Sequence, residues 1–417
     1  MNAPLVTGIG VIAPTGIGVS GHWQSSLDGV RRLRPLGRPD AGNAPIKVAG
    51  EVDEFVESEH VPSKVRVQTD RWTWFALAAS QMALDDARLS VDEHDPFDLS
   101  VVTASASGGN EFGQREIQAL WKQHPKKVSA YQSIGWFYAA STGQISIRHQ
   151  LKGGCGVVVS DSAGALDALN QARRVLRSGG KAVLVGGTEA PLSPYALSCQ
   201  SSLRQLNPDP SPETAYRPFH PSGVGYVPGE GGAIMILEDA ASAAARGVDG
   251  YAAFLGHAAT HDAFHPSKPS PEGRQLARAI SNALERAGVG PDDVDVVFAD
   301  GAGDAEADAG EANALRAVFG GRLADLPVTI PKTMVGRLMS GAGALDVAWA
   351  ALALHTGELP PTVNADAELT RQHYGINLVT ERTRPQRLRT ALVIARGVGG
   401  FNSAVVLGAV DGRRESL

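Results

Sequence analysis

The chain has 417 residues, a formal net charge of -6, 43% hydrophobic residues and 20% charged residues, the composition of a globular protein with a large core. This length exceeds one ordinary domain and predicts two domains or a duplicated fold. The negative net charge and the lack of a dense basic block argue against a nucleic-acid partner, and no run of about 20 apolar residues could span a membrane.

The first half of the chain alternates apolar runs with helical patterns. Its N-terminus lacks the basic and then apolar pattern of a signal peptide. Asp70 is the candidate N-cap of a helix at 70–89. We expect strands at 5–12, 97–109, 181–190 and 231–239, a helix at 111–121, and a strand, a turn and a helix over 157–180.

The second half repeats this rhythm. Alternating strands and helices predict a layered α/β architecture, and the halves 1–245 and 246–417 look like a structural duplication. We interpret the polar, turn-rich segment 207–225 as an excursion over the surface. We expect strands at 250–260 and 294–303, helices at 271–288 and 343–362, and a hairpin at 390–408.

One glycine pattern suggests a nucleotide site but fits it poorly. Gly16, Gly18 and Gly21 spell G-x-G-x-x-G, and Asp40 lies near the distance expected for the acidic partner of such a site. However, Pro14 interrupts the junction between strand and helix that dinucleotide binding needs. We therefore interpret the three glycines as a structural turn.

The histidines and cysteines have structural interpretations too. His257, His261 and His265 recur every four residues and could bind zinc on a helix, but a strand pattern precedes them and prolines follow, so we expect no metal. We expect Cys155 and Cys199 to be small packing residues rather than nucleophiles. Two cysteines in a chain of this length indicate a reducing compartment, and we expect a cytoplasmic protein.

Ser162 is the sharpest candidate for chemistry. It lies in SDSAG between a strand and a helix, where backbone N–H groups favour developing negative charge. A hydrolase elbow has glycine where this chain has Ser160, and a nucleophilic serine also needs a base and an orienting group. The spacing does not identify a histidine for that role, so a catalytic and a structural Ser162 both stay open.

Seven segments in order resemble the condensing enzymes of the β-ketoacyl synthase family. They are VTGIGVIAPTGIG, SDSAGALDAL, VLVGGTEA, YRPFHPSGVGYVPGEGGAIMILE, DGAGDAEADAGE, PKTMVGRLMSGAG and GVGGFNSAVVLG. The resemblance runs nearly end to end and implies the thiolase fold, a duplicated five-layer αβαβα architecture. Active members join an acyl and a malonyl thioester with one cysteine and two histidines, and the resemblance implies neither cofactor nor metal.

Each catalytic position of that family is altered in this chain. By alignment of the motifs, Ser162 stands at the nucleophilic cysteine, Asp300 at the first histidine and Arg337 at the second, while Lys332 is retained. Serine is a far weaker nucleophile than cysteine, and Asp300 would repel an oxyanion. Arg337 keeps its charge and therefore cannot give up a proton as a general acid. The resemblance therefore implies a subunit that no longer condenses.

Other segments resemble one branch of the family, the chain length factors, or ketosynthase β subunits, of type II polyketide synthases. They are GYVPGEGGA, EFGQREIQALW, SAYQSIGWFYAASTGQISIRH and GVGGFNS. In the last of these, Gly399, Gly400 and Phe401 form a loop near the site, and Phe401 stands where active enzymes have histidine. The resemblance implies a heterodimer with an active ketosynthase α subunit, transient binding of an acyl carrier protein, and an interface tunnel for the growing polyketide.

The resemblance also implies a gating helix that begins near Asn110 and includes Phe112, Gly113 and Ile117. Because residues three and seven apart share a helical face, we expect Asn110, Gly113 and Ile117 to project together. Gly113 has no side chain, so we expect a roomy tunnel and a long product. Ile117 could equally well pack in the core.

Two hypotheses about function follow. In the first, the chain is a catalytically inactive ketosynthase-like subunit that sets polyketide chain length through the interface tunnel. In the second, it is an enzyme in its own right that uses Ser162 for malonyl-carrier-protein decarboxylation, acyl transfer or thioester hydrolysis. Many chain length factors have a glutamine at this position that is linked to priming decarboxylation, and its replacement here argues against that reaction.

Overall fold

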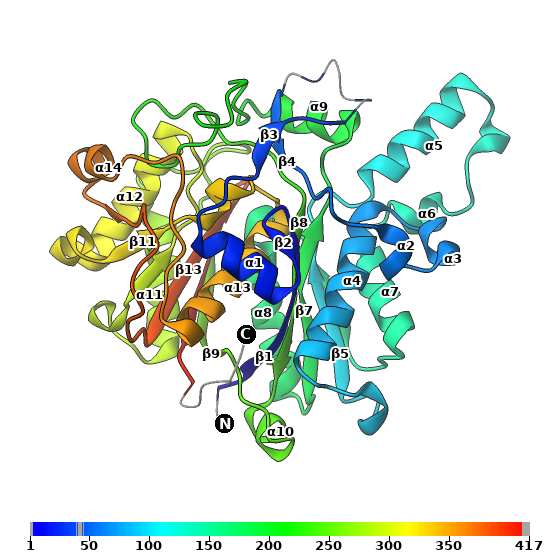
Figure 1. The fold of residues 1–417 in the computed structure, drawn as a ribbon, viewed down its shortest axis with the longest axis horizontal. Coiled ribbons are helices and arrows are strands. Elements are labelled where there is room, and N and C mark those ends of the chain that lie inside the picture. Colours follow the sequence, from blue (N-terminus) through cyan, green and yellow to red (C-terminus); the bar gives the residue numbers. More distant parts are fainter. Residues whose placement is uncertain (1–2, 39, 41–43, 45, 411–417) are drawn as a thin grey trace.

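The computed structural model describes residues 3–38, 40, 44 and 46–410, which form an α/β fold around one large sheet (Figure 1). The strand order is β12-β11-β10-β13-β14-β9-β1-β8-β7-β5-β6. The sheet has two halves, which meet where β1 pairs with β9 through residues 5 and 6 only. The predicted α/β class is therefore confirmed.

The first half of the sheet contains five main strands. β8 runs antiparallel to both β1 and β7, and β5 and β6 continue parallel to β7. Their bounds are β1 Leu5–Ala13, β5 Leu99–Ala104, β6 Cys155–Val158, β7 Ala182–Glu189 and β8 Gly231–Glu238. The short strand β2 (Gly16–Ile17) pairs with β1, and β3 (Leu33–Pro35) and β4 (Val48–Gly50) form a separate sheet.

The second half repeats this pairing scheme. β14 runs antiparallel to both β9 and β13, and β10, β11 and β12 continue parallel to β13. In each half, the first long strand pairs with the last, which is the topology of a duplicated unit. The bounds are β9 Ala252–His261, β10 Val296–Phe298, β11 Pro327–Thr329, β12 Asn377–Leu378, β13 Thr390–Gly397 and β14 Phe401–Gly408.

Two helices, α8 (Gly164–Arg177) and α13 (Ser340–Thr356), lie between the halves of the sheet (Figure 1). α13 packs against β7, β8 and β13, and α8 packs against β5, β7 and α13. Every residue of α13 up to Leu354 is buried, as expected for a helix that is apolar all round. A Cβ added to Gly343 would lie 2.7 Å from the Ser162 carbonyl oxygen, so α13 touches the turn of interest directly.

Outer helices complete five αβαβα layers, which confirms the predicted architecture. α4 (Arg71–Asp86) and α7 (Ala140–His149) cover the first half of the sheet, and α11 (Arg274–Ala287), with α12 (Ala305–Phe319) beside it, covers the second. Apart from α5 and α6, the other α-helices of the described residues are α1 Val19–Leu27, α2 Glu57–His60, α3 Ser63–Arg66, α9 Pro194–Ser202, α10 Ala240–Ala245 and α14 Ala367–Tyr374.

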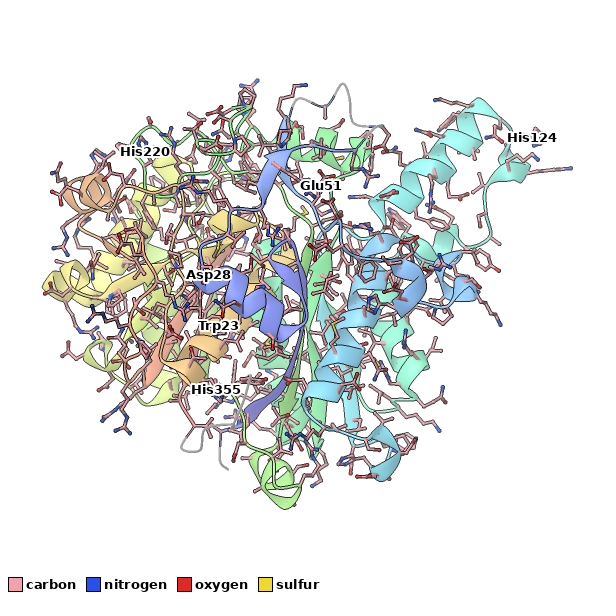
Figure 2. The ribbon with its side chains drawn as sticks, viewed as in Figure 1. Trp23, Asp28, Glu51, His124, His220 and His355 are labelled. Atoms are coloured by element: carbon pink, nitrogen blue, oxygen red, sulfur yellow. The ribbon has the colours of Figure 1, made fainter. Side chains whose placement is uncertain are left out.

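An arm made by α5 (Asn110–Lys122) and α6 (Gln132–Gly135) projects from the layers (Figure 1). His124, just beyond α5, lies at its tip, on the opposite side of the molecule from His220 (Figure 2). Asp70 occupies the N-cap position of α4, but its side chain makes no hydrogen bond to that helix. Its Oδ2 instead accepts the Phe112 N–H at 2.7 Å, so the carboxylate caps α5.

The segment 207–225 is not only an excursion over the surface, and that interpretation is wrong in part. Tyr216 and Phe219 are fully buried, and the Tyr216 hydroxyl donates to the Gly301 carbonyl oxygen at 2.7 Å. The polar residues around them hid these apolar anchors in the sequence. No helix among the described residues is long and apolar enough to cross a membrane.

Candidate functional site

The turn that contains Ser162 joins β6 to α8 and is held from two sides. The Asp161 carboxylate accepts the Val398 N–H at 2.9 Å, and the Asp161 carbonyl oxygen accepts the Ser340 hydroxyl at 2.9 Å. Asp161 has a φ of +51°, a left-handed conformation that non-glycine residues seldom adopt. These contacts fix Ser162, which is nearly buried, at the wall of a cavity.

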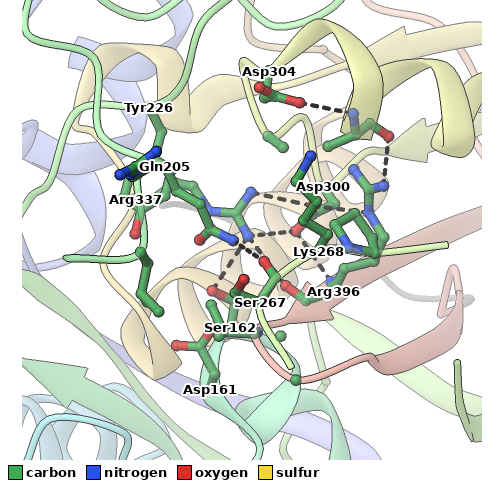
Figure 3. Close-up of a pocket in the computed structure, with 18 of the residues that line it drawn as sticks. Asp161, Ser162, Gln205, Tyr226, Ser267, Lys268, Asp300, Asp304, Arg337 and Arg396 are labelled. Carbon is green, nitrogen blue, oxygen red and sulfur yellow. Dashed lines mark hydrogen bonds and ion pairs between the residues drawn. The ribbon is translucent and has the colours of Figure 1, made fainter. Parts of the chain in front are cut away.

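The three positions aligned with catalytic residues lie together in one cluster (Figure 3). Arg337 donates from Nη1 and Nη2 to the two carboxylate oxygens of Asp300, at 3.1 and 3.0 Å. Its Nη2 also donates to Ser162 Oγ at 3.4 Å. The cluster is therefore an ion pair with a weakly attached serine hydroxyl, in place of a thiol and two imidazoles.

Arg396 on β13 is a member of this cluster that the sequence analysis missed. Its Nε donates to Asp300 Oδ2 at 3.1 Å, and its backbone N–H donates to Oδ1 at 3.1 Å. Its Nη2 donates to Glu311 Oε2 at 2.7 Å. An arginine inside the apolar run TALVIARG was the available signal, because buried charges need partners.

The cations determine the charge state of the site. Burial alone would raise the pKa of the Asp300 carboxyl, but Arg337, Arg396 and Lys332 hold it well below its usual range. Burial likewise opposes the charge on Arg337, yet Asp300 raises the pKa of this guanidinium well above its usual value. Asp300 is therefore an ionised carboxylate that is paired with two guanidiniums.

The loop after β10 is held by buried charged side chains. Glu311 accepts the N–H groups of Asp300 and Gly301 at 2.8 and 3.0 Å. Lys332 donates to the carbonyl oxygens of residues 299 and 300 at 2.9 and 3.1 Å and pairs with Asp346 at 2.6 Å. Burial raises the pKa of Asp346 to about 6, although Lys332 opposes this. The retained lysine thus fixes the backbone that carries Asp300.

The cavity beside the cluster has a volume of about 460 Å³. A guanidinium is the hydrogen-bond partner of the Ser162 hydroxyl among the described residues, and a guanidinium cannot accept a proton. The nucleophile and base arrangement that activates a serine is therefore not formed here. The lining includes Asp161, Ser162, Tyr226, Asp300, Arg337 and Arg396.

The other candidate residues lie outside this cluster. His257 and His261 lie on β9 and His265 in the loop after it, and the described residues contain no group of histidine, cysteine and acidic side chains that could hold a metal.

Gly16 and Gly18 have positive φ in the turn around β2. The packing role expected for both cysteines is wrong, because Cys155 on the edge strand β6 and Cys199 on α9 are exposed. Asp40 pairs with Arg38.

The glycine loop at 397–400 adjoins the serine turn. A Cβ added to Gly397 would lie 2.4 Å from the carbonyl oxygen of Ser160. Gly399 lines the cavity, and both Gly399 and Gly400 have φ near +95°, which favours glycine. The Phe401 ring packs edge-on against His261, with centroids 5.1 Å apart.

The residues of the expected gating helix lie on α5 but in different environments. Asn110 donates to the Ser107 hydroxyl at 2.6 Å, and Phe112 is buried. A Cβ added to Gly113 would lie 3.0 Å from Cδ1 of Trp136, so an indole lies beside this glycine, and the roomy tunnel stays a prediction. Ile117 is 46% exposed, which excludes the core-packing alternative within this chain. Helical spacing could not reveal an indole that comes from another segment.

The fold and the site define a class of protein. Residues 4–243 match the model of the family described as "Beta-ketoacyl synthase, N-terminal domain", and residues 251–366 match "Beta-ketoacyl synthase, C-terminal domain". The chain therefore belongs to the β-ketoacyl synthase family. Within that family it groups with the ketosynthase β subunits, or chain length factors, of type II polyketide synthases.

Relatives of known sequence support this grouping. A "Putative polyketide beta-ketoacyl synthase 2" of Streptomyces coelicolor is 49% identical over 404 residues, which cover 97% of this chain and 94% of the relative. The "Tetracenomycin polyketide synthase ketoacyl synthase beta subunit" of Streptomyces glaucescens is 47% identical over 412 residues, covering 98% and 99% of the two chains.

Two solved structures have the same fold. The ishigamide ketosynthase/chain length factor superposes with a TM-score of 0.89 at 27% identity, over 99% of this chain and all of the matched chain. A type II polyketide synthase acyl-carrier protein in complex with its ketosynthase, bound to the hexaketide, contains a chain that also superposes with a TM-score of 0.89, at 26% identity over 98% of this chain and all of the matched one.

Proposed function

We propose that this chain is a non-condensing subunit that pairs with an active ketosynthase and shapes the tunnel in which a polyketide grows. In this role the cluster of Ser162, Asp300 and Arg337 stabilises the fold and takes no part in the reaction. The partner supplies the cysteine and the two histidines, an acyl carrier protein brings the substrates, and side chains of this chain limit the length of the product.

The ion cluster carries this proposal. Decarboxylative condensation needs a soft nucleophile and two hydrogen-bond donors directed at one thioester carbonyl. Here Asp300 accepts hydrogen bonds at a position where the family has a hydrogen-bond donor. Two N–H groups of Arg337 donate to Asp300 and are not free to bind a thioester carbonyl. An oxyanion at this position would meet a carboxylate, and the serine hydroxyl would lack a base. This arrangement supports the loss of condensation.

A surface on the arm side of the molecule supports pairing with another subunit. Large apolar side chains are exposed on α5, around α6, on α7 and just after β6, and β6 is an edge strand that pairs with β5 alone among the described strands. Stable interfaces bury such surfaces. We call this set the apolar face: Ile117, Trp121, Ile134, Trp136, Phe137, Ile147 and Val159.

The comparisons support the identity of the partner. One similar structure is a ketosynthase/chain length factor, and the other holds an acyl-carrier protein on its ketosynthase. Since this chain groups with the β subunits, we propose that an active ketosynthase α subunit covers its apolar face.

Reconstitution tests this proposal. The chain, its ketosynthase partner and the carrier protein are purified separately and mixed with malonyl substrate. We expect no polyketide from the chain and carrier protein alone, and full synthesis from the complete set. Ser162→Ala should leave the rate and the product distribution of the complete set unchanged, because the hydroxyl makes one weak hydrogen bond and has no base.

A matched control identifies the working site. Alanine at the catalytic cysteine of the ketosynthase partner should abolish synthesis, whereas alanine at position 162 of this chain should not. Loss of product with Ser162→Ala, or an acyl group found on Ser162 by mass spectrometry, would support the rival hypothesis of an enzyme in its own right.

A further inference from the structure

Four glycines bring the α6 segment against the start of α5. A Cβ added to Gly109 would lie 1.9 Å from the Gly135 carbonyl oxygen, and a Cβ on Gly135 would lie 2.9 Å from the Phe112 ring. The Gly109 N–H donates to the Trp136 carbonyl oxygen at 3.3 Å. No larger residue fits these contacts without a shift of the backbone or ring. We call Gly108, Gly109, Gly113 and Gly135 the glycine seat.

The glycine seat places the indole of Trp136 over α5. With the backbone of Trp136 held at Gly109, its Cδ1 lies 3.0 Å and its Nε1 3.8 Å from the position of a Cβ on Gly113. The ring is also near Tyr138, with centroids 6.1 Å apart. Trp136 therefore occupies the room that Gly113 leaves, with Tyr138 as a second neighbour.

The other side of the indole faces outward. Trp136 is 45% exposed, and Ile117, one helical turn beyond Gly113, is 46% exposed. The two residues belong to the apolar face, and Phe112, by contrast, is buried beneath it. A rigid aromatic ring that is fixed at its base and open at its surface can act as a wall at little cost in entropy.

We propose that Trp136 is a specificity-determining residue, whose indole sets the position at which the growing chain is stopped beside α5. This inference rests on the proposed function, because it needs the apolar face to wall the polyketide tunnel. Gly113 and Trp136 then act as one unit: the glycine makes room, and the indole fills it. Total side-chain volume at this point, rather than the residue at 113 alone, determines product length.

Trp136→Ala in the complete reconstituted complex tests the inference. We expect products longer by at least one two-carbon unit, read by mass spectrometry. The double variant Trp136→Ala with Gly113→Phe returns a ring to the same place from α5 and should restore the original length. Phe97→Ala is the matched control, since Phe97 is also an exposed aromatic residue but precedes the opposite end of β5; it should change nothing.

Ile117→Trp tests independently of Trp136 whether the apolar face walls the polyketide tunnel. A shorter product from Ile117→Trp, with unchanged length from Trp136→Ala, would overturn the inference and leave the proposed function standing. Unchanged length in both variants would overturn both. Loss of copurification with the ketosynthase in Trp136→Ala would also overturn the inference, because Trp136 would then be a binding residue. Longer products with restoration in the double variant would support it.

Discussion

Asp300 accepts hydrogen bonds from two guanidiniums and one backbone N–H, so a single carboxylate joins β10, β13 and the segment before α13. Glu311 extends the network through Arg396. Buried ion pairs are stable only when every charge keeps its partner. Asp300, Arg337, Arg396 and Glu311 therefore join the elements of the second half of the fold.

Arg396→Met should be strongly destabilising. It removes one of the two guanidiniums that pair with Asp300 and leaves Glu311 without its charged partner, so we expect a loss of about 3–5 kcal/mol in the free energy of unfolding. Urea denaturation followed by circular dichroism measures this. Arg382→Met removes an exposed arginine that bridges Asp28 and Glu358 and should cost less than about 1 kcal/mol. Similar losses in the two variants would contradict the argument.

The sequence predicted part of this site. Motif spacing brought Ser162, Asp300 and Arg337 together correctly, because each follows a recognisable turn or loop pattern. Arg396 stayed hidden, since its strand reads as an apolar run and the sequence does not show which charges lie across the fold. The indole beside Gly113 stayed hidden for a related reason: it comes from a segment beyond α5.

Among the elements, α5 is the most dependent on its neighbours. Its N-terminal N–H groups need acceptors, and the Asp70 carboxylate at the start of α4 supplies one to Phe112. The Gln114 side chain of α5 accepts the Tyr195 N–H at 2.7 Å, which ties the start of α9 to the arm. Helical periodicity predicted α5 within a residue or so at each end, but these contacts, which orient the arm, follow from tertiary packing.

Asp70→Asn should flatten the dependence of stability on pH. Burial raises the pKa of Asp70 to about 7, so the folded chain binds more protons than the unfolded chain between about pH 4 and pH 7, and stability falls as pH rises through that range. Asparagine keeps an acceptor for the Phe112 N–H but does not titrate. The unfolding free energy of the variant should fall less steeply, by up to about 1.4 kcal/mol per pH unit.

Asp366→Asn provides the control for this measurement. Asp366 also caps a helix, accepting the Leu369 N–H at 2.9 Å, but it is exposed to solvent. This variant removes a carboxylate from the start of a helix, as Asp70→Asn does, but not a buried one. Equal slopes for the wild type and Asp70→Asn would show that the buried carboxyl does not contribute as argued.

At the scale of the whole molecule, the two halves of the sheet bury their apolar surface at the centre, but apolar side chains stay exposed at one side. α13 is buried between the two halves of the sheet, whereas β6 ends the strand order and the apolar face stands beside it. The apolar runs in the sequence predicted the long strands but not the short strands β2, β3, β4, β11 and β12. They gave no indication of which apolar residues would be left outside, because that depends on how the arm folds back.

The stability of the chain should therefore depend on its ketosynthase partner. A partner that binds only the folded chain raises the unfolding free energy by about 2.7 kcal/mol at a free concentration 100 times the Kd, and thermal midpoints should rise steadily as partner is added. Ile147→Asp, which puts a charge on the exposed apolar face, should abolish this rise, whereas Phe97→Asp, which puts the same charge on an exposed apolar residue outside that set, should preserve it. A midpoint independent of partner concentration would mean that the apolar face is covered in some other way.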